Sequence, residues 1–179
     1  MMELIDRLTG DEVKALERLY VASFPPEERR AWSDVVARAE CGTITLYGVR
    51  IDGRVAGLIT VWHLGSVDYV EHFAIDPASR GAGIGGKVIE EVVRRAGGRP
   101  VVLEVERSGS NEMASRRIAF YSRHGFRAID DFDYVQPPYG DGLPWVPLML
   151  MSSGTINPVD VARELYVTVY GCDSVAPCV

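Results

Sequence analysis

Residues 80–86 form the segment of the chain best suited to bind an anion. Their sequence is Arg-Gly-Ala-Gly-Ile-Gly-Gly, and an apolar pattern typical of a helix begins within it. Glycines let backbone N–H groups approach phosphate oxygens closely, and the N-terminus of a helix attracts negative charge. Arg80 adds a charged donor. We therefore expect this segment, the glycine-rich loop, to hold a phosphate or pyrophosphate, with a plain strand-to-helix turn as the alternative.

Three phosphate-binding patterns overlap in the glycine-rich loop. The dinucleotide-binding pattern G-x-G-x-x-G is met at Gly81, Gly83 and Gly86. Residues 76–80 separate it from the preceding strand, and the upstream strands read as antiparallel hairpins, which argues against a dinucleotide site. The P-loop pattern lacks its Ser or Thr, because Val88 stands in that position. A third pattern, R-x-x-G-x-G, is complete in the loop.

A second motif, downstream of the loop, distinguishes among these three patterns. Residues 116–126, R-R-I-A-F-Y-S-R-H-G-F, resemble the late helix of the GNAT N-acetyltransferase superfamily, where an aromatic-Tyr pair precedes x-x-x-Gly-Phe. Residues 73–85 are similar to the acyl-CoA loop of that superfamily and the strand before it. Both motifs occur in the family's order and spacing, and the resemblance covers residues 3–151.

The resemblance implies an α+β chain with the GNAT acyltransferase fold. Its sheet would be mixed, mostly antiparallel and splayed at the acyl-CoA strand, with helices on both faces. Residues 1–151 would form the acetyltransferase domain, and residues 152–179 a C-terminal helix and frayed tail packed on it. Hydropathy patterns predict helices at 11–20, 33–40, 83–96, 115–124 and 157–170, and strands at 3–8, 43–50, 54–63, 69–75, 100–106, 126–130 and 145–151, with a loop at 136–147.

The resemblance also implies an activity, N-acetyl transfer from acetyl-CoA to an amine by direct attack on the thioester. Three strand residues, Phe73, Ala74 and Ile75, would pair with the pantetheine arm as an added strand does. The N–H of Phe73 would polarise the thioester carbonyl. The pyrophosphate would be bound by Arg80, Gly81, Ala82, Gly83, Ile84, Gly85 and Gly86. A non-catalytic acyl-CoA sensor is the alternative function.

Two residues are the expected acid and base. Tyr121 matches the family's tyrosine general acid, with packing beside Phe120 as the alternative. Glu71 is the expected base because strand alternation puts it on the face of Phe73, with a paired surface charge as the alternative. Family members can carry the base four residues before the thioester-binding N–H, where this chain has Tyr69.

Two further positions bear on the chemistry. Glu104, on the next strand, is a second candidate for the base, with a solvated strand edge as the alternative. Many family members place an Asn seven residues before the tyrosine to contact the cofactor. This chain has Ala114 there, and Asn111 lies three residues earlier.

The acceptor side is expected to be built from residues 24–29 and the late loop. Aromatic rings there would form a slot for a cation, and nearby carboxylates would attract positive charge; rings that only close the end of the sheet are the alternative. These residues are Tyr134, Tyr139 and Trp145, and Asp131, Asp133 and Asp141.

Composition narrows the class of partner. The formal net charge of −6 disfavours nucleic acid as a ligand, and no apolar run approaches the ~20 residues of a membrane helix. The three cysteines form no CxxC pair, so we expect neither a metal site nor disulfides, and a cytoplasmic location. The expected partner is a small-molecule or peptide amine, and the resemblance allows a homodimer.

Overall fold

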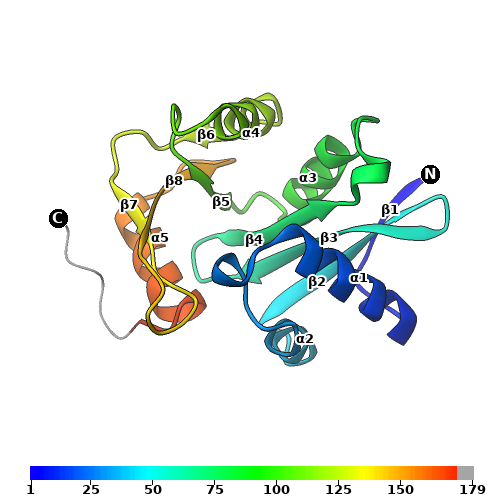
Figure 1. Ribbon diagram of the computed structural model, residues 1–179. Helices are drawn as coiled ribbons and strands as arrows, with labels where there is room; N and C mark the ends of the chain where they lie inside the picture. Colours follow the sequence, from blue (N-terminus) through cyan, green and yellow to red (C-terminus); the bar gives the residue numbers. More distant parts are fainter. Residues whose placement is uncertain (173–179) are drawn as a thin grey trace. The chain divides into compact units, whose positions relative to one another are not determined.

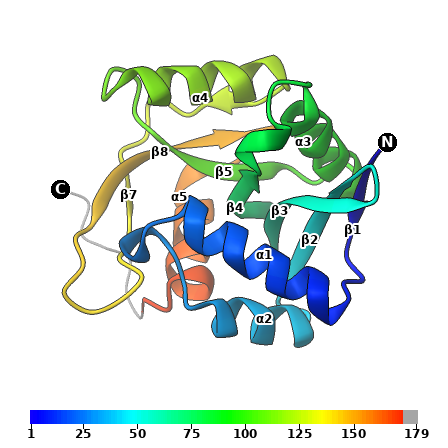
Figure 2. The same ribbon diagram turned by 45° about the vertical axis from the view of Figure 1, so that its right-hand side comes forward.

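The structure is a computed structural model that describes residues 1–172 (Figures 1 and 2). The predicted frayed tail, with Cys178, lies outside the described residues. The chain divides into two compact units. The first unit comprises Met1–His63 with Val70–Val92, and the second comprises Leu64–Tyr69 with Val93–Val179. Within residues 1–172, no helix has the length and apolar character needed to cross a membrane.

The first unit is built on an antiparallel meander. Strand β1 (Met2–Ile5) pairs with β2 (Ile44–Ile51), and β2 pairs with β3 (Arg54–His63). Most of β4 (Asp68–Ile75) and of helix α3 (Ile84–Arg95) also belongs to this unit. The remaining elements are the helices α1 (Gly10–Ser23) and α2 (Trp32–Glu40) and the 3₁₀ turns η1 (Pro26–Glu28) and η2 (Pro77–Ser79).

Local sequence explains how the first two helices begin and pack. Thr9 and Glu12 form a capping box at the start of α1, in which each side chain bonds the backbone N–H of the other. Helix α1 packs on β3 through Leu16 and Tyr20, both fully buried, and α2 packs on β2 through Val35 (Figure 2). This arrangement attaches the predicted acceptor segment, residues 24–29, to the sheet of the first unit.

The second unit is organised around strand β8 (Val146–Ser152). It pairs antiparallel with β5 (Val101–Glu106) on one side and with the short strands β6 (Arg127–Ala128) and β7 (Tyr134–Gln136) on the other. Helix α4 (Glu112–Arg123) lies against β5 and β6 (Figure 1). Helix α5 (Pro158–Glu164), capped by Asn157 as predicted, continues into the π-helical turn η3 (Leu165–Val169).

The predicted α+β class and the mostly antiparallel sheet are confirmed, and most elements lie where hydropathy predicts them. Two local features were not predicted: a short strand before the late loop, and a start of α4 three residues before the predicted one. Residues 134–136 form β7, which is too short to show alternation and owes its pairing to β8. Helix α4 begins at Glu112 because Asn111 accepts the N–H of Ala114 at 2.7 Å, so this asparagine is a helix cap.

Gly57 sets how closely β4 approaches β3. A Cβ at this position would lie 2.6 Å from Ile75 Cδ1 and 3.0 Å from the carbonyl oxygen of Ala74. Gly57→Ala should therefore lower the free energy of unfolding by ~1–3 kcal/mol, because the strand must move or Ile75 must repack. Chemical denaturation measures this loss.

Gly10→Ala is the matched control, because no heavy atom lies within 4 Å of a Cβ built there. Alanine also favours a helix more than glycine does, so this variant should keep or slightly raise the stability. A Gly57→Ala protein as stable as wild type would show that β4 is not held close to β3.

Candidate functional site

The glycine-rich loop joins η2 to α3 through residues in a conformation that favours glycine. Gly81 has φ +93° and Gly83 has φ +69°. No heavy atom lies within 4 Å of a Cβ built on either, so backbone conformation rather than crowding is what requires glycine there. The two residues turn the chain from the end of β4 into the first turn of α3.

The first turn of α3 presents backbone donors. The N–H of Lys87 bonds the carbonyl of Gly83 at 3.3 Å, the first such bond of the helix. The N–H groups of residues 84–86 precede it and therefore have no carbonyl within the helix. Together with the helix dipole, they make this terminus favourable for an anion.

Arg80 is fixed beside this terminus. Its Nε donates to the carbonyl oxygen of Ile75 at 3.0 Å, and its backbone N–H donates to the carbonyl of Pro77 at 3.3 Å. Asp76 shapes η2 by accepting the N–H of Ala78 at 2.9 Å. A cation, a row of helix donors and the end of a strand thus follow one another along the chain.

The residues predicted to hold the pantetheine arm are the last three of β4. Phe73 is half-buried, while Ala74 and Ile75 are buried in the core of the first unit. Immediately after them, the N–H of Asp76 donates to the carbonyl of Ala56 at 2.8 Å. The structure therefore places Phe73–Ile75 next to the glycine-rich loop, as predicted. Their contact with a cofactor stays a prediction.

Glu71, the expected base, is part of a buried ion pair. Arg30 Nε donates to Glu71 Oε1 at 2.8 Å, and Trp62 Nε1 donates to Oε2 at 2.7 Å. The Glu71 side chain is only 1% exposed. Burial alone would raise the pKa of Glu71, but adjacent His72, the Arg30 charge and the indole N–H outweigh it and lower the pKa to about 2. So low a pKa makes this carboxylate a weak proton acceptor, and its predicted role as base stays untested.

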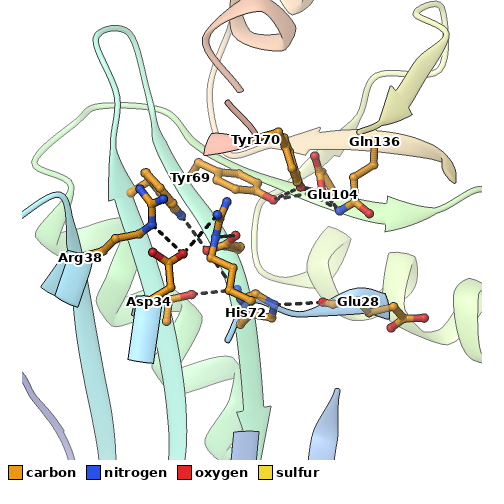
Figure 3. Close-up of polar contacts among 12 residues, drawn as sticks. Glu28, Asp34, Arg38, Tyr69, His72, Glu104, Gln136 and Tyr170 are labelled. Atoms are coloured by element: carbon orange, nitrogen blue, oxygen red, sulfur yellow. Dashed lines mark hydrogen bonds and ion pairs between the residues drawn. The ribbon is translucent and has the colours of Figure 1, made fainter. Parts of the chain in front are cut away.

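The same network anchors the segment before α2. Asp34 Oδ2 accepts from Arg38 Nε at 2.9 Å and lies 3.5 Å from Arg30 Nη1 (Figure 3). Both guanidinium groups lie 5.1 Å from the centre of the Trp62 ring. On the opposite face of β4, Nε2 of His72 lies 3.1 Å from the carbonyl oxygen of Glu28. Charges and rings therefore tie this segment to β3 and β4.

Tyr121, the expected acid, lies in the second unit on α4. It is 8% exposed, and its ring packs 5.1 Å from that of Phe120 and 5.7 Å from that of Phe126. Burial raises the pKa of Tyr121 to about 12, against a smaller opposing effect of the Arg117 charge. Its hydroxyl is thus protonated at neutral pH, as a proton donor must be. The packing alternative is observed, and the acid role stays a prediction.

A second buried carboxylate, Glu104 on β5, is surrounded by hydrogen-bond donors from the second unit (Figure 3). Its Oε2 accepts from the hydroxyls of Tyr69 at 3.0 Å and Tyr170 at 2.8 Å, and from Gln136 Nε2 at 2.5 Å. Its Oε1 accepts from the hydroxyl of Tyr134. We call these five residues the Glu104 cluster. Glu104 was predicted as a candidate, but Gln136 and Tyr170 give no local sequence signal.

The predicted aromatic slot is only partly formed. Tyr134 is buried in the core and bonds Glu104, as the alternative of rings that close the sheet predicted. Tyr139 packs 5.4 Å from the ring of Tyr170, and Trp145, 44% exposed, lies 6.0 Å from the ring of Tyr166. The rings do gather in one region of the second unit, around the Glu104 cluster.

Comparison with known proteins identifies the family. The family model of the acetyltransferase (GNAT) domain matches residues 42–128. A solved structure from Bacteroides thetaiotaomicron, described as an acetyltransferase of the GNAT family, is 37% identical with a TM-score of 0.87 and covers 96% of this chain and 99% of that chain. The chain therefore belongs to the GNAT family of acetyltransferases. This confirms the predicted family, fold and acyltransferase class.

More distant solved structures share the fold. NAA60 of Arabidopsis thaliana, in complex with a bisubstrate analogue, is 18% identical with a TM-score of 0.64 over 85% of this chain and 97% of that chain. Naa50 of the same plant, in complex with the bisubstrate analogue CoA-Ac-MVNAL, is 17% identical with a TM-score of 0.62 over 86% and 99%. No curated protein matches the sequence.

The ion pair of Glu71 should contribute stability that depends on pH. Glu71→Gln leaves the Arg30 guanidinium without its buried counter-charge, so at pH 7 it should lower the free energy of unfolding by about 3 kcal/mol. The pKa of Glu71 is lowered from 4.5 to about 2 in the folded protein. The contribution is therefore complete above pH 4.5 and is lost as the pH falls toward 2.

Denaturation of both proteins between pH 7 and pH 3 checks this expectation. The difference in the free energy of unfolding between wild type and Glu71→Gln should decrease as the pH falls. Glu17→Gln, at an exposed position of α1, is the control and should unfold with the same free energy as wild type. A Glu71→Gln gap that stays constant over the whole pH range would contradict the ion pair.

Proposed function

We propose that the protein transfers the acetyl group of acetyl-CoA to the nitrogen of an amine acceptor. The observation that carries the proposal is the continuity of β4, Arg80 and the first turn of α3, which puts the last residues of a strand and an anion site in immediate succession. Membership of the GNAT family supports the reaction class. The analogue CoA-Ac-MVNAL bound to the similarly folded Naa50 supports coenzyme A as the carrier.

In this proposal, the chain's own groups hold the donor. The N–H groups of residues 84–86 and the Arg80 guanidinium bind the pyrophosphate through charge-assisted hydrogen bonds. The backbone of Phe73–Ile75 pairs with the pantetheine amides. One of these N–H groups, that of Phe73, polarises the thioester carbonyl and stabilises the negative charge that develops on its oxygen.

The chemical step is a direct transfer. The neutral amine nitrogen attacks the thioester carbonyl, the C–N bond forms, and the C–S bond breaks with its electron pair leaving on sulfur. The nitrogen, which is cationic after the attack, releases one proton to solvent and becomes the amide nitrogen. The Tyr121 hydroxyl gives its proton to the thiolate and later recovers one from solvent. Its raised pKa is consistent with a group that is protonated at neutral pH and available as an acid.

The acceptor in this proposal is a small-molecule or peptide amine. A peptide amine is supported by the bisubstrate analogue CoA-Ac-MVNAL bound to Naa50, because MVNAL reads as a peptide in one-letter code. We also infer a cytoplasmic location, because the three cysteines form no pattern typical of an oxidised protein.

Release of free thiol from acetyl-CoA tests the activity directly. Wild type should release coenzyme A when mixed with benzylamine, aniline, spermidine or a short peptide with a free N-terminus. Acetyl-CoA at about 100 times its dissociation constant should also stabilise the protein by about 2.7 kcal/mol. Stabilisation by acetyl-CoA without thiol release for any amine would instead identify a sensor. The absence of both stabilisation and thiol release would refute the proposal.

Two substitutions distinguish binding of acetyl-CoA from the chemical step. Tyr121→Phe should lower kcat by ~10²-fold with little change in acetyl-CoA affinity, because only the proton donor is lost. Arg80→Ala should weaken acetyl-CoA binding by about 10-fold or more, because a charged donor to the pyrophosphate is lost. Calorimetry and initial rates measure the two effects.

Arg18→Ala, at an exposed position of α1, is the control for loss of a positive charge and should leave both quantities unchanged. A Tyr121→Phe enzyme with wild-type kcat would remove Tyr121 from the mechanism. Equal acetyl-CoA affinity of Arg80→Ala and wild type would remove Arg80 from the binding site.

A further inference from the structure

The segment between α1 and α2, residues 24–31, is held in place by side chains of other elements. Apart from the 3₁₀ turn η1, these residues form no helix or strand, so their backbone depends on side chains for part of its hydrogen bonding. The hydroxyl of Tyr20 accepts the N–H of Arg30 at 3.1 Å and lies 3.4 Å from the carbonyl oxygen of the same residue. Nε2 of His72 lies 3.1 Å from the carbonyl oxygen of Glu28 (Figure 3). The path of the segment is therefore set by α1 and β4.

Arg30 gives this segment a charged anchor on β4. Its side chain is only 11% exposed, and its Nε donates to Glu71 Oε1 at 2.8 Å. Trp62 Nε1 fixes the other carboxylate oxygen, Oε2, at 2.7 Å, and the guanidinium lies 5.1 Å from the centre of the Trp62 ring. A buried ion pair is rarely more stabilising than apolar side chains of the same size, and the role best attested for one is to fix a single arrangement of the chain.

The anchor lies beside the proposed donor site on the same strand. Glu71 precedes Phe73 by two residues on β4, so both side chains lie on one face of the strand, with Cα atoms about 7 Å apart. In the proposed function, the N–H of Phe73 polarises the thioester carbonyl. A segment that is bonded to Glu71 is therefore fixed close to the carbon that the amine attacks.

We propose that Arg30 and Glu71 are positioning residues, whose ion pair holds residues 24–31 in the arrangement that binds the acceptor amine. The inference rests on the proposed function and identifies the residues that set the affinity for its acceptor. It gives Glu71 a role other than that of a base, because the carboxylate stays ionised and bonded to Arg30 throughout the reaction. Acetyl-CoA is held by Arg80 and residues 84–86, so loss of the ion pair weakens binding of the amine and leaves binding of acetyl-CoA unchanged.

Removal of both charges separates positioning from stability. The double variant Arg30→Met with Glu71→Gln loses the ion pair without leaving a buried charge unpaired, and the glutamine oxygen can still accept from Trp62 Nε1. It should therefore unfold at about the same denaturant concentration as wild type. Initial rates are measured with whichever of benzylamine, aniline, spermidine and the short peptide wild type acetylates fastest. The KM for that amine should rise about 10-fold, while kcat and the dissociation constant of acetyl-CoA should each change by less than about threefold.

Tyr20→Phe tests the same positioning by a different bond. It removes the hydroxyl that bonds the backbone of Arg30 and leaves the ion pair in place. The KM for the amine should rise here too, by a smaller factor of about threefold, because a neutral hydrogen bond contributes less than a charged one. In both variants, backbone amides of residues 24–31 should exchange hydrogen faster than in wild type, because the segment opens more often.

Arg50→Met is the matched control. It also removes an arginine from ion pairs of the first unit, with Glu12 at 2.5 Å and Glu3 at 3.5 Å, and neither partner belongs to residues 24–31. The variant should leave the KM for the amine, kcat and the exchange of residues 24–31 unchanged.

Each outcome decides a different point. A double variant with wild-type KM for the amine would show that the ion pair only stabilises the first unit, and would overturn the inference. A fall in kcat of ~10²-fold at unchanged KM would place Glu71 in the chemical step and would overturn it as well. Retained stabilisation by acetyl-CoA shows that the variants are folded, and if the double variant is not, the KM of Tyr20→Phe decides. A wild type that releases no thiol with any amine would overturn the proposed function itself, and this inference with it.

Discussion

The turn between β4 and α3 is the constraint on which the rest of the account depends. Within a few residues the chain must end a strand, turn, and begin a helix whose first N–H groups have no carbonyl partner within the helix. Gly81 and Gly83 achieve this with positive φ angles, and the Arg80 side chain is bonded back to the end of the strand. The end of a strand and an anion site are therefore connected through the backbone itself.

Two buried glutamates show how the surroundings of a side chain determine the direction in which its pKa shifts. Glu71 faces a guanidinium and an indole N–H, so its charged form is favoured and it stabilises the first unit. Glu104 is enclosed mainly by phenols, whose neutral hydrogen bonds do not offset the cost of burial, so its pKa is raised. Such a separation of pKa values is the pattern by which acids and bases are distinguished in enzymes.

Sequence reasoning succeeds here where the signal is local. The glycine-rich loop, the cap at Asn157 and the hairpin strands each depend on neighbouring residues, and all are found where predicted. It fails where distant segments meet. Arg30 and Glu71 are 41 residues apart, and Tyr170 and Glu104 are 66 apart. The periodicity of one strand cannot tell a surface charge from a buried ion pair, because the partner lies on another element.

A structure determined with coenzyme A bound is the most direct test of the central claim. The account predicts that the pyrophosphate is bound by the N–H groups of residues 84–86 and by Arg80, with the pantetheine amides paired to the backbone of Phe73–Ile75. Coenzyme A bound away from the first turn of α3, or a pantetheine arm that makes no hydrogen bond to β4, would contradict it.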